Sequence, residues 1–327
     1  MKTCKHLLLA LPLAFVVACS SDSDNDEEYT EKTYPIIVTA TERPIANPSA
    51  AQNSMRRAPI TTTSSLENFN LFFWGDDIGF GSAVGTFSKT GTHWVGNQNW
   101  PTDYTANDSW KLTFYACNAG TSKSKEYGEA CIDVHVNEES NKQVDLLAAK
   151  NAVSYSSCGG IVPLEFDHIS AAVQVNLCKT DKLSGYTVVV SEVILHNIMC
   201  QGEYFFDREE KWDLYGNPTY YTITAYEQGG LDVTTTLKPL TDSDDYLFLL
   251  PQELTGWDKT STLNNSYIEI KCKIFNTVVG YKVGSSDSYE SVYLPLEATL
   301  EMGKINSLNI SMGTALRYSN GDKIKIF

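Results

Sequence analysis

Apolar and polar residues alternate along most of this chain, with the period of two that is typical of β-strands. The clearest case is residues 169–177, where every odd position is apolar, which predicts a half-buried strand. Further alternating or short apolar runs predict strands at 34–41, 69–74, 83–88, 110–116, 132–136, 162–166, 186–190, 193–198, 220–225, 246–250, 267–275, 292–300, 307–312 and 322–327. The one helix we expect is short and lies within residues 140–149.

Many short strands separated by turn residues indicate an all-β protein built from β-sandwiches. The chain has 327 residues, which is enough for two domains of ordinary size. We therefore predict two consecutive β-sandwich domains, at 33–180 and 181–327, with the break near residues 179–186. No short repeat is present, which argues against a solenoid or a propeller.

The first 18 residues have the pattern of a secretory signal peptide. Lys2 and Lys5 precede an apolar run that ends in Val16-Val17-Ala18-Cys19. The run from Leu7 to Val17 is too short for a membrane-spanning helix, which needs about 20 apolar residues. A cysteine directly after a small residue makes the segment a lipobox. We expect cleavage before Cys19 and lipid on its thiol, the alternative being an ordinary signal in which the cysteine stands by chance.

The segment that follows, residues 19–32, is predicted to be an acidic tether. Ser20 to Glu28 read SSDSDNDEE, and a run of this kind repels itself and has no apolar surface to bury. A calcium loop is the alternative interpretation, but the glycine and the late glutamate of an EF-hand loop are missing.

The charge of the chain argues against nucleic-acid binding. The formal net charge is -15, and removal of Lys2 and Lys5 with the signal makes it -17. Phosphate backbones would be repelled, and no basic patch with interleaved aromatic residues is present.

Six cysteines remain once Cys4 is removed and Cys19 carries lipid. Their spacing fits no C-x-x-C metal or redox motif, so we assign them structural roles. Cys272 shares the alternating face of neighbouring isoleucines and is predicted to be buried, whereas Cys178 and Cys200 end neighbouring strands and could pair. The connectivity stays open for Cys117, Cys131, Cys158, Cys178, Cys200 and Cys272.

No catalytic, metal or cofactor site is predicted. The four histidines beyond the signal lie in separate segments, and no nucleophile elbow, P-loop or dinucleotide fingerprint occurs. His168 is interpreted as a capping or core residue, and the acids Asp242, Asp244 and Asp245 as a solvated turn rather than a glycosidase pair. A glycan platform is conceivable for the tryptophans, although most are expected to pack in the core: Trp74, Trp94, Trp100, Trp212 and Trp257.

Several segments, in this order, resemble the fimbrillin-like lipoproteins, the type V pilin subunits of gut and oral Gram-negative anaerobes. They are Arg56-Arg57-Ala58-Pro59, residues 68–74, 110–116, 163–173, 193–202, 246–252 and 302–308. The resemblance covers essentially the whole mature chain. It implies two consecutive β-sandwiches, the first of them transthyretin-like, which agrees with the strand pattern.

The resemblance also implies a mechanism of assembly. In the family, an arginine-specific protease cuts the loop after the first strand, that strand leaves, and a strand from another subunit enters the groove. The corresponding cleavage here is after Arg56 or Arg57, and the alternative is a basic pair in an ordinary loop. The leaving strand would comprise Tyr34, Ile36, Ile37, Val38, Thr39, Ala40 and Thr41, and the donor strand Lys323, Ile324, Lys325, Ile326 and Phe327. Because Ile37 and Val38 are adjacent, the sequence leaves open which face of the leaving strand enters the groove.

The predicted function is therefore a structural or adhesive fimbrial subunit, not an enzyme, with no cofactor. A short C-terminal segment favours a minor, tip or anchor component. Its expected partners are other fimbrial subunits, the outer membrane through the lipid, and a host or glycan ligand, and its location is the outer membrane, cell surface and fimbrium. The alternative is a surface lipoprotein that binds glycans without polymerising.

Overall fold

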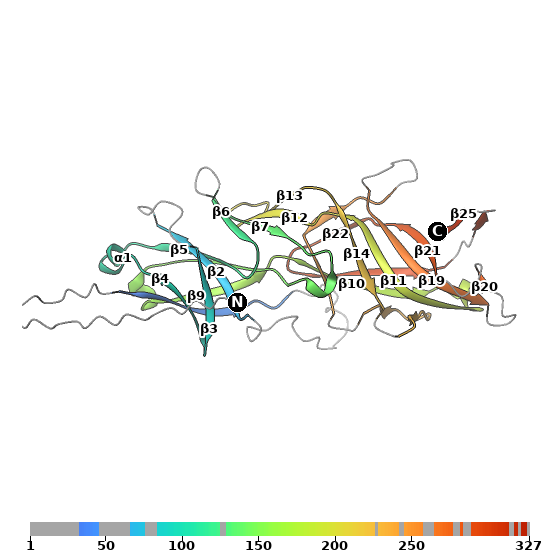
Figure 1. Ribbon diagram of the computed structural model, residues 1–327, viewed down its shortest axis with the longest axis horizontal. Coiled ribbons are helices and arrows are strands. Elements are labelled where there is room, and N and C mark those ends of the chain that lie inside the picture. The colour runs from blue at the N-terminus through green and yellow to red at the C-terminus, as the bar shows by residue number, and fades with distance from the viewer. Residues whose placement is uncertain are drawn as a thin grey trace, which may run out of the picture. The chain divides into compact units, whose positions relative to one another are not determined.

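A computed structural model describes residues 33–45, 66–75, 84–124, 129–225, 228–241, 245–257, 265–276, 282–283, 289–313, 317–319 and 322–325. The fold is all-β, as predicted (Figure 1). The helical elements in this part of the chain are single turns or little more: α1 Thr102–Ala106, η2 Ser140–Lys142, α2 Tyr155–Cys158 and η3 Asp181–Leu183.

A closed barrel forms the first part of the structure, with strands hydrogen-bonded in the order β1-β4-β3-β2-β5-β8-β9. Its strands are β1 Pro35–Glu42, β2 Asn68–Trp74, β3 Gly85–Thr90, β4 His93–Asn99, β5 Leu112–Cys117, β8 Leu147–Val153 and β9 Ile161–His168. Most pairs are antiparallel, but β1 runs parallel to β9. A parallel pair needs a long connection, and here Ile37 pairs with Ile161 across most of the barrel sequence.

Residues on both sides of position 180 share the next sheet, β13-β12-β7-β6. Its strands are β6 Thr121–Ser124, β7 Ala130–His135, β12 Gln201–Phe205 and β13 Trp212–Tyr215. The chain itself passes from the barrel to the later sheets between β9 and β10 (Ala171–Lys179), since β10 pairs with β16, β17 and β23.

The remaining sheets are formed by the C-terminal half of the chain. The six-stranded sheet contains β11 Tyr186–Ile198, β14 Thr219–Thr224, β15 Leu231–Asp232, β19 Tyr267–Asn276, β20 Lys282–Val283 and β21 Glu290–Pro295, several of them side by side in Figure 1. The partners of β10 are β16 Lys238–Pro239, β17 Leu247–Leu249 and β23 Ile305–Met312. Two small pairs complete the set: β18 Gln252–Leu254 with β22 Ala298–Leu300, and β24 Arg317–Ser319 with β25 Asp322–Lys325.

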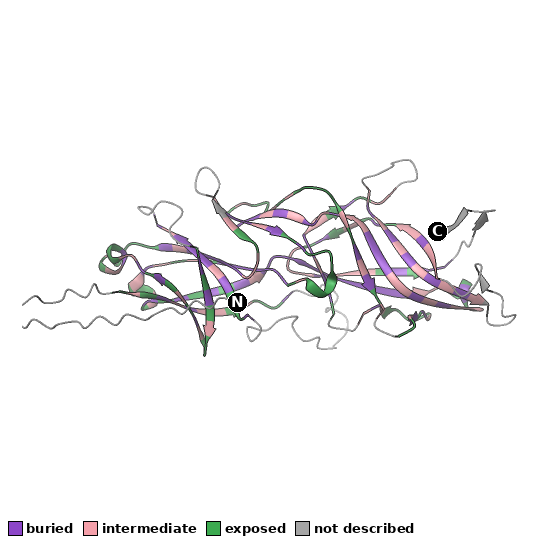
Figure 2. Ribbon diagram, viewed as in Figure 1, coloured by how far each residue is buried: buried purple, intermediate pink, exposed green. Residues whose placement is uncertain are grey.

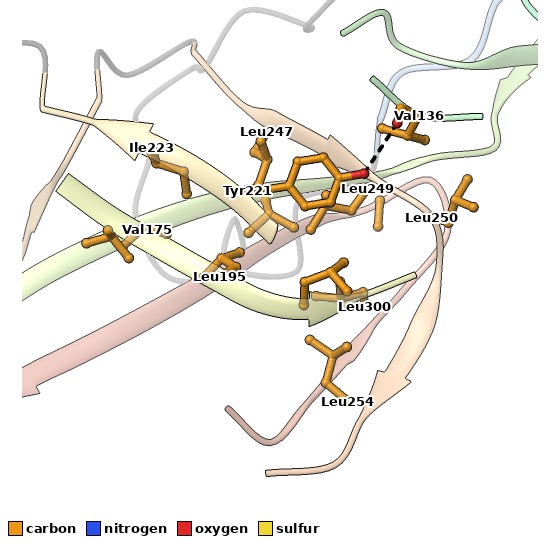
Figure 3. Packing of buried hydrophobic residues seen from close by; sticks show 14 of the residues in the cluster. Val136, Val175, Leu195, Tyr221, Ile223, Leu247, Leu249, Leu250, Leu254 and Leu300 are labelled. Carbon is orange, nitrogen blue, oxygen red and sulfur yellow. Dashed lines mark hydrogen bonds between the residues drawn. The ribbon is translucent and has the colours of Figure 1, made fainter. Parts of the chain in front are cut away.

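Two large clusters of buried side chains hold these sheets together, and buried residues alternate with exposed ones along the strands (Figure 2). The barrel cluster is aromatic, with Phe69, Phe87 and Phe166 all buried. The other cluster is mostly aliphatic and surrounds Tyr221, whose phenol donates a hydrogen bond to the carbonyl of Val136 (3.5 Å; Figure 3). Burial raises the pKa of Tyr221, so the phenol stays neutral.

Two strands predicted at 186–190 and 193–198 form one long strand, β11. The inward positions are Val188 and Val190 before Ser191, and Val193 and Leu195 after it. The pairing with β19 shifts its register between Val190 and Glu192, which marks a β-bulge. The bulge shifts the inward positions from even to odd numbers, and for this reason the sequence pattern predicted two strands instead of one.

The helix predicted within 140–149 is wrong except for the single turn η2. Leu147, Ala148 and Ala149 begin β8, which pairs with β5 and β9. All three are buried. Alanine has a high intrinsic helix propensity, but pairing with the barrel strands β5 and β9 makes this segment a strand.

The strand predicted to be half-buried, now β10, is buried on both faces. Its even positions Ala172, Gln174 and Asn176 are covered as fully as its odd ones. The Asn176 amide donates to Oδ1 of Asn309 in β23 (3.0 Å), so one buried polar group is satisfied by the neighbouring strand. Polar residues in β10 therefore do not mark an exposed face.

Candidate functional site

The predicted leaving strand lies in the wall of the barrel as β1. It pairs antiparallel with β4 on one side and parallel with β9 on the other. The parallel ladder runs from Ile37–Ile161 to Glu42–Phe166. Both edges of β1 are thus hydrogen-bonded, and this strand alone separates β4 from β9.

The inward face of β1 is formed by Ile36 and Val38. Both side chains are 0% exposed and lie in the barrel cluster with Phe69 and Phe166. Ile37 and Thr39 are only partly buried and lie on the other face. The choice of face that the sequence left open is therefore decided by the packing.

Both ends of β1 are tied to neighbouring segments. At the start, the Trp100 amide donates to the Tyr34 carbonyl (2.7 Å), and the Tyr34 ring packs edge-on against Tyr155. At the end, the Arg43 amide donates to the carbonyl of Phe166 in β9 (2.9 Å).

The guanidinium of Arg43 bridges two carboxylates of β9. Nη2 lies 2.5 Å from Oε2 of Glu165, and Nη1 lies 3.0 Å from Oδ1 of Asp167. The hydrogen bond from Arg43 lowers the pKa of Glu165. All three side chains are about half exposed, so this contact is open to screening by salt.

A buried polar group lies beside the end of β1. His168 Nδ1 is 2.6 Å from Oδ2 of Asp145, and the Ser170 hydroxyl donates to Oδ1 of the same carboxylate (2.8 Å). Burial opposes the protonation of His168, but the hydrogen bond and charge of Asp145, together with the charge of Glu42 in β1, outweigh it and raise the pKa. Because the serine bonds the aspartate and not the imidazole, the arrangement is not that of an activated serine nucleophile.

The other predicted assembly residues fall partly outside the described ranges. Cys19, Arg56, Arg57, Ile326 and Phe327 all lie there. The described part of the predicted donor strand, Lys323 to Lys325, belongs to β25, which pairs with β24.

The six cysteines are placed in the core or at its margin. Cys178 and Cys200, which the sequence suggested as a pair, are both thiols, and Cys272 is buried as predicted. Burial raises the pKa of Cys117 and of Cys272 to about 12 in each case, so neither is a reactive thiolate at neutral pH.

The tryptophans pack inside the molecule for the most part. Trp94 and Trp100 are buried and donate their indole N–H groups to the carbonyls of Leu66 and Gly160. Trp74 and Trp212 are partly buried against the larger core cluster, and Trp257 lies beside Tyr267. These five side chains therefore do not form a common exposed platform.

Within the ranges that the structure describes, no group of three or more His, Cys, Asp or Glu residues is arranged to hold a metal ion. In the same part of the chain, no helix has both the length and the apolar character to cross a membrane. Asp245 has its carbonyl bound by the Thr241 hydroxyl within a turn, whereas Asp242 and Asp244 lie outside the described residues.

The fold is that of a fimbrial protein. The chain aligns with a fimbrial protein from Bacteroides vulgatus ATCC 8482 at 15% identity and a TM-score of 0.57, over 86% of this chain and 96% of that one. It also aligns with the fimbrial anchor protein Mfa2 from Porphyromonas gingivalis at 9% identity and a TM-score of 0.38, over 90% and 95% of the two chains. No curated protein matches.

The family follows from the sequence match. The model of the fimbrillin-like family matches residues 57–325, and the chain belongs to that family, as the resemblance predicted. Membership of this family associates the chain with fimbriae.

Proposed function

We propose that this chain is a minor or tip subunit of a fimbrium, delivered to the outer membrane as a lipoprotein through Cys19 and assembled by strand exchange. Cleavage after Arg56 or Arg57 frees β1, and a strand from another subunit takes its place between β4 and β9. The proposal keeps two consecutive domains, a transthyretin-like sandwich at 33–180 and a second sandwich at 181–327, with β10 of the first range paired to strands of the second. Acidic residues 19–32 serve as the tether.

The observation that carries the proposal is the position of β1. Its removal would open two strand edges at once and uncover the core positions that Ile36 and Val38 now fill. An incoming strand would recover both sets of main-chain hydrogen bonds, and its alternate side chains would enter the vacated positions.

The layout of the sequence supports the same scheme. Residues 43–67 are the only covalent link from β1 to β2, and they contain Arg56 and Arg57. The family match begins at Arg57, beyond β1. In the predicted donor strand, Ile324 and Ile326 have the same two-residue spacing as Ile36 and Val38.

Limited trypsin digestion of the purified mature chain tests the proposal. Arg43 is followed by Pro44, a bond that trypsin does not accept, so the N-terminal fragment should end at Arg56 or Arg57 and still contain β1. Release of this fragment, followed by a ladder of oligomers on a mild detergent gel, is the expected result.

The matched control is the double variant Arg56→Gln with Arg57→Gln, which should keep β1 joined to the rest of the chain and stay monomeric under the same digestion, even if trypsin also trims the tether after Lys32. A clipped wild-type chain that remains monomeric at high concentration would refute strand exchange. Mapping the N-terminus on intact cells separates the roles: Cys19 identifies an anchored form, and Arg57 or Ala58 a processed subunit.

A further inference from the structure

A cavity of about 610 Å³ lies against the sheet β13-β12-β7-β6, far from β1 in the topology. In this sheet Val134, Gly202 and Leu214 are directly paired and contribute to the interior. Alternation therefore turns their neighbours His135, Gln201 and Tyr215 to the opposite side, where they line the cavity. Residues 142–144 also line the cavity.

Tyr215 is held along the surface of this sheet. It belongs to β13, but its phenol donates a short hydrogen bond to Oδ1 of Asp133 in β7, and β12 lies between the two strands. Neighbouring strands are about 4.8 Å apart, so the side chain must extend across β12 to reach that carboxylate. The residue is 40% exposed and lines the cavity.

Hydrogen-bonding groups surround this ring. His135, Gln201 and Tyr215 occupy one row across the three strands, because Gln201 pairs directly with each of the other two. An imidazole and a primary amide can each both donate and accept hydrogen bonds. Val144, which also lines the cavity, is 56% exposed and offers a small apolar contact.

Side-chain hydrogen bonds hold the backbone segments beside the cavity in place. The Asn118 amide donates to the Asp145 carbonyl (2.7 Å), and its Oδ1 accepts from the Leu147 amide (2.8 Å). Gln143 donates to the Asn137 carbonyl and accepts from the Phe248 amide, each at 2.9 Å. These bonds hold Gln143 and the segments next to Ala119 and Leu146, all of which line the cavity, and such ordering lowers the entropic cost of binding.

The charge beside the cavity selects against anions. Glu203 lies directly opposite Asp213 on one side and Asp133 on the other, so three carboxylates form one cross-strand row. Asp133 lines the cavity and repels an acidic ligand, and the lysine in the lining, Lys142, is already paired with Glu139 (2.6 Å). Phosphorylated and sialylated molecules are therefore disfavoured.

We propose that this cavity binds a neutral saccharide, with the Tyr215 ring as the stacking surface and His135 and Gln201 as hydrogen-bonding partners of the hydroxyl groups. An aromatic ring with a polar rim matches a sugar, which presents C–H groups on its faces and hydroxyls at its edge. The site does not depend on strand exchange, since none of its residues belongs to β1 or its neighbours in the barrel.

A printed glycan array tests the proposal with the intact mature chain. The array carries neutral probes (glucans, mannans, galactans and N-acetyllactosamine) together with sialylated N-acetyllactosamine. The strongest neutral probe is then titrated against Tyr215→Ala, and against Tyr220→Ala as the matched control. Tyr220 is also an exposed strand tyrosine, at 56%, but does not line the cavity.

We expect a neutral probe to bind, and Tyr215→Ala to weaken it roughly tenfold while Tyr220→Ala leaves it unchanged. Val144→Arg provides a second test, since it fills the cavity from an exposed position whether or not Tyr215→Ala folds normally. Binding that survives both Tyr215→Ala and Val144→Arg overturns the proposal. So does an array on which only the sialylated probe binds, or none.

Discussion

The imidazole of His168 and the carboxylate of Asp145 form an almost wholly buried pair, with 2.6 Å between Nδ1 and Oδ2. The pair links the end of β9 to the segment before β8, close to the last residue of β1. Because the imidazole titrates with a raised pKa, it makes the stability of this part of the barrel dependent on pH.

The direction of that dependence follows from the raised pKa of His168. The charged imidazole is favoured in the folded state, so its contribution to the free energy of unfolding is complete below the ordinary pKa of 6.5 and is lost as the pH rises through the raised value. We expect His168→Asn, which keeps a neutral donor, to lose more stability at pH 5.5 than at pH 8.5. Urea unfolding of both proteins at the two pH values measures the difference. An equal loss at both would show that the imidazole is neutral when folded.

The two isoleucines of β1 should differ sharply when truncated. Ile36→Ala removes a fully buried side chain and leaves a cavity, which costs about 2–5 kcal/mol of unfolding free energy. Ile37→Ala, at the next residue but on the other face, should cost about 1 kcal/mol or less. Urea unfolding of the uncleaved chain compares them. Similar losses would mean that β1 does not sit with Ile36 inward.

The bridge from Arg43 to Glu165 and Asp167 should slow the loss of β1 after cleavage. We expect Arg43→Gln to release the trypsin fragment faster than the wild type in low salt, and at the same rate in 1 M NaCl, where the Debye length is about 3 Å. In the wild type, release should also quicken in acid, since a lowered pKa stabilises only above it and the effect is lost as the pH falls through it. Size-exclusion chromatography of the digest follows the fragment, and a salt-independent difference would exclude an ionic contact.

Two glycines with the same backbone angle provide a test of packing beside His168. Gly91 and Gly303 both have φ of +66°, but a Cβ on Gly303 would lie 3.0 Å from the carbonyl of His168, whereas one on Gly91 would meet nothing within 4 Å. Alanine at Gly91 should cost about 1–2 kcal/mol for the left-handed backbone alone. Alanine at Gly303 should cost more, and thermal unfolding of the two variants gives the difference. Equal values would show that the loop at Gly303 relaxes freely.

The thiols should react in the order of their exposure. Cys158 and Cys178 are partly exposed, whereas Cys117 and Cys272 are buried with a pKa of about 12. Iodoacetamide applied to the native protein should therefore label the first two and leave the second two until urea is added. Peptide mass spectrometry reads the order. Early labelling of Cys117 would indicate that the larger core cluster, in which its side chain lies, opens in the native protein.

The alternation of residues predicted most of the strands because burial of one face is a local signal. The alternation gave wrong predictions where contacts with strands distant in sequence decide the local structure. Ser191 looked like a boundary because a bulge inverts the alternation, and Ala148 and Ala149 looked helical because only their barrel neighbours make them a strand. Neither effect is encoded within a short window of sequence.

The candidate sites were predictable to different degrees. The sequence marked β1 and its apolar residues, but only the barrel shows that Ile36 faces inward and that Arg43 meets Glu165. The sequence suggested the tryptophans as a saccharide platform. It did not mark Tyr215, because the position of that side chain depends on Asp133, which is 82 residues away in sequence.

The closure of the barrel by its own first strand has one more consequence. Unpaired strand edges recruit other chains indiscriminately, and natural proteins cover them to avoid aggregation. Here β1 covers such edges within its own chain. While β1 remains in place, the edges of β4 and β9 that it pairs with are not open to another chain. If the proposed strand exchange operates, the intact chain is a protected precursor, and β1, a strand of eight residues, is what holds back its assembly.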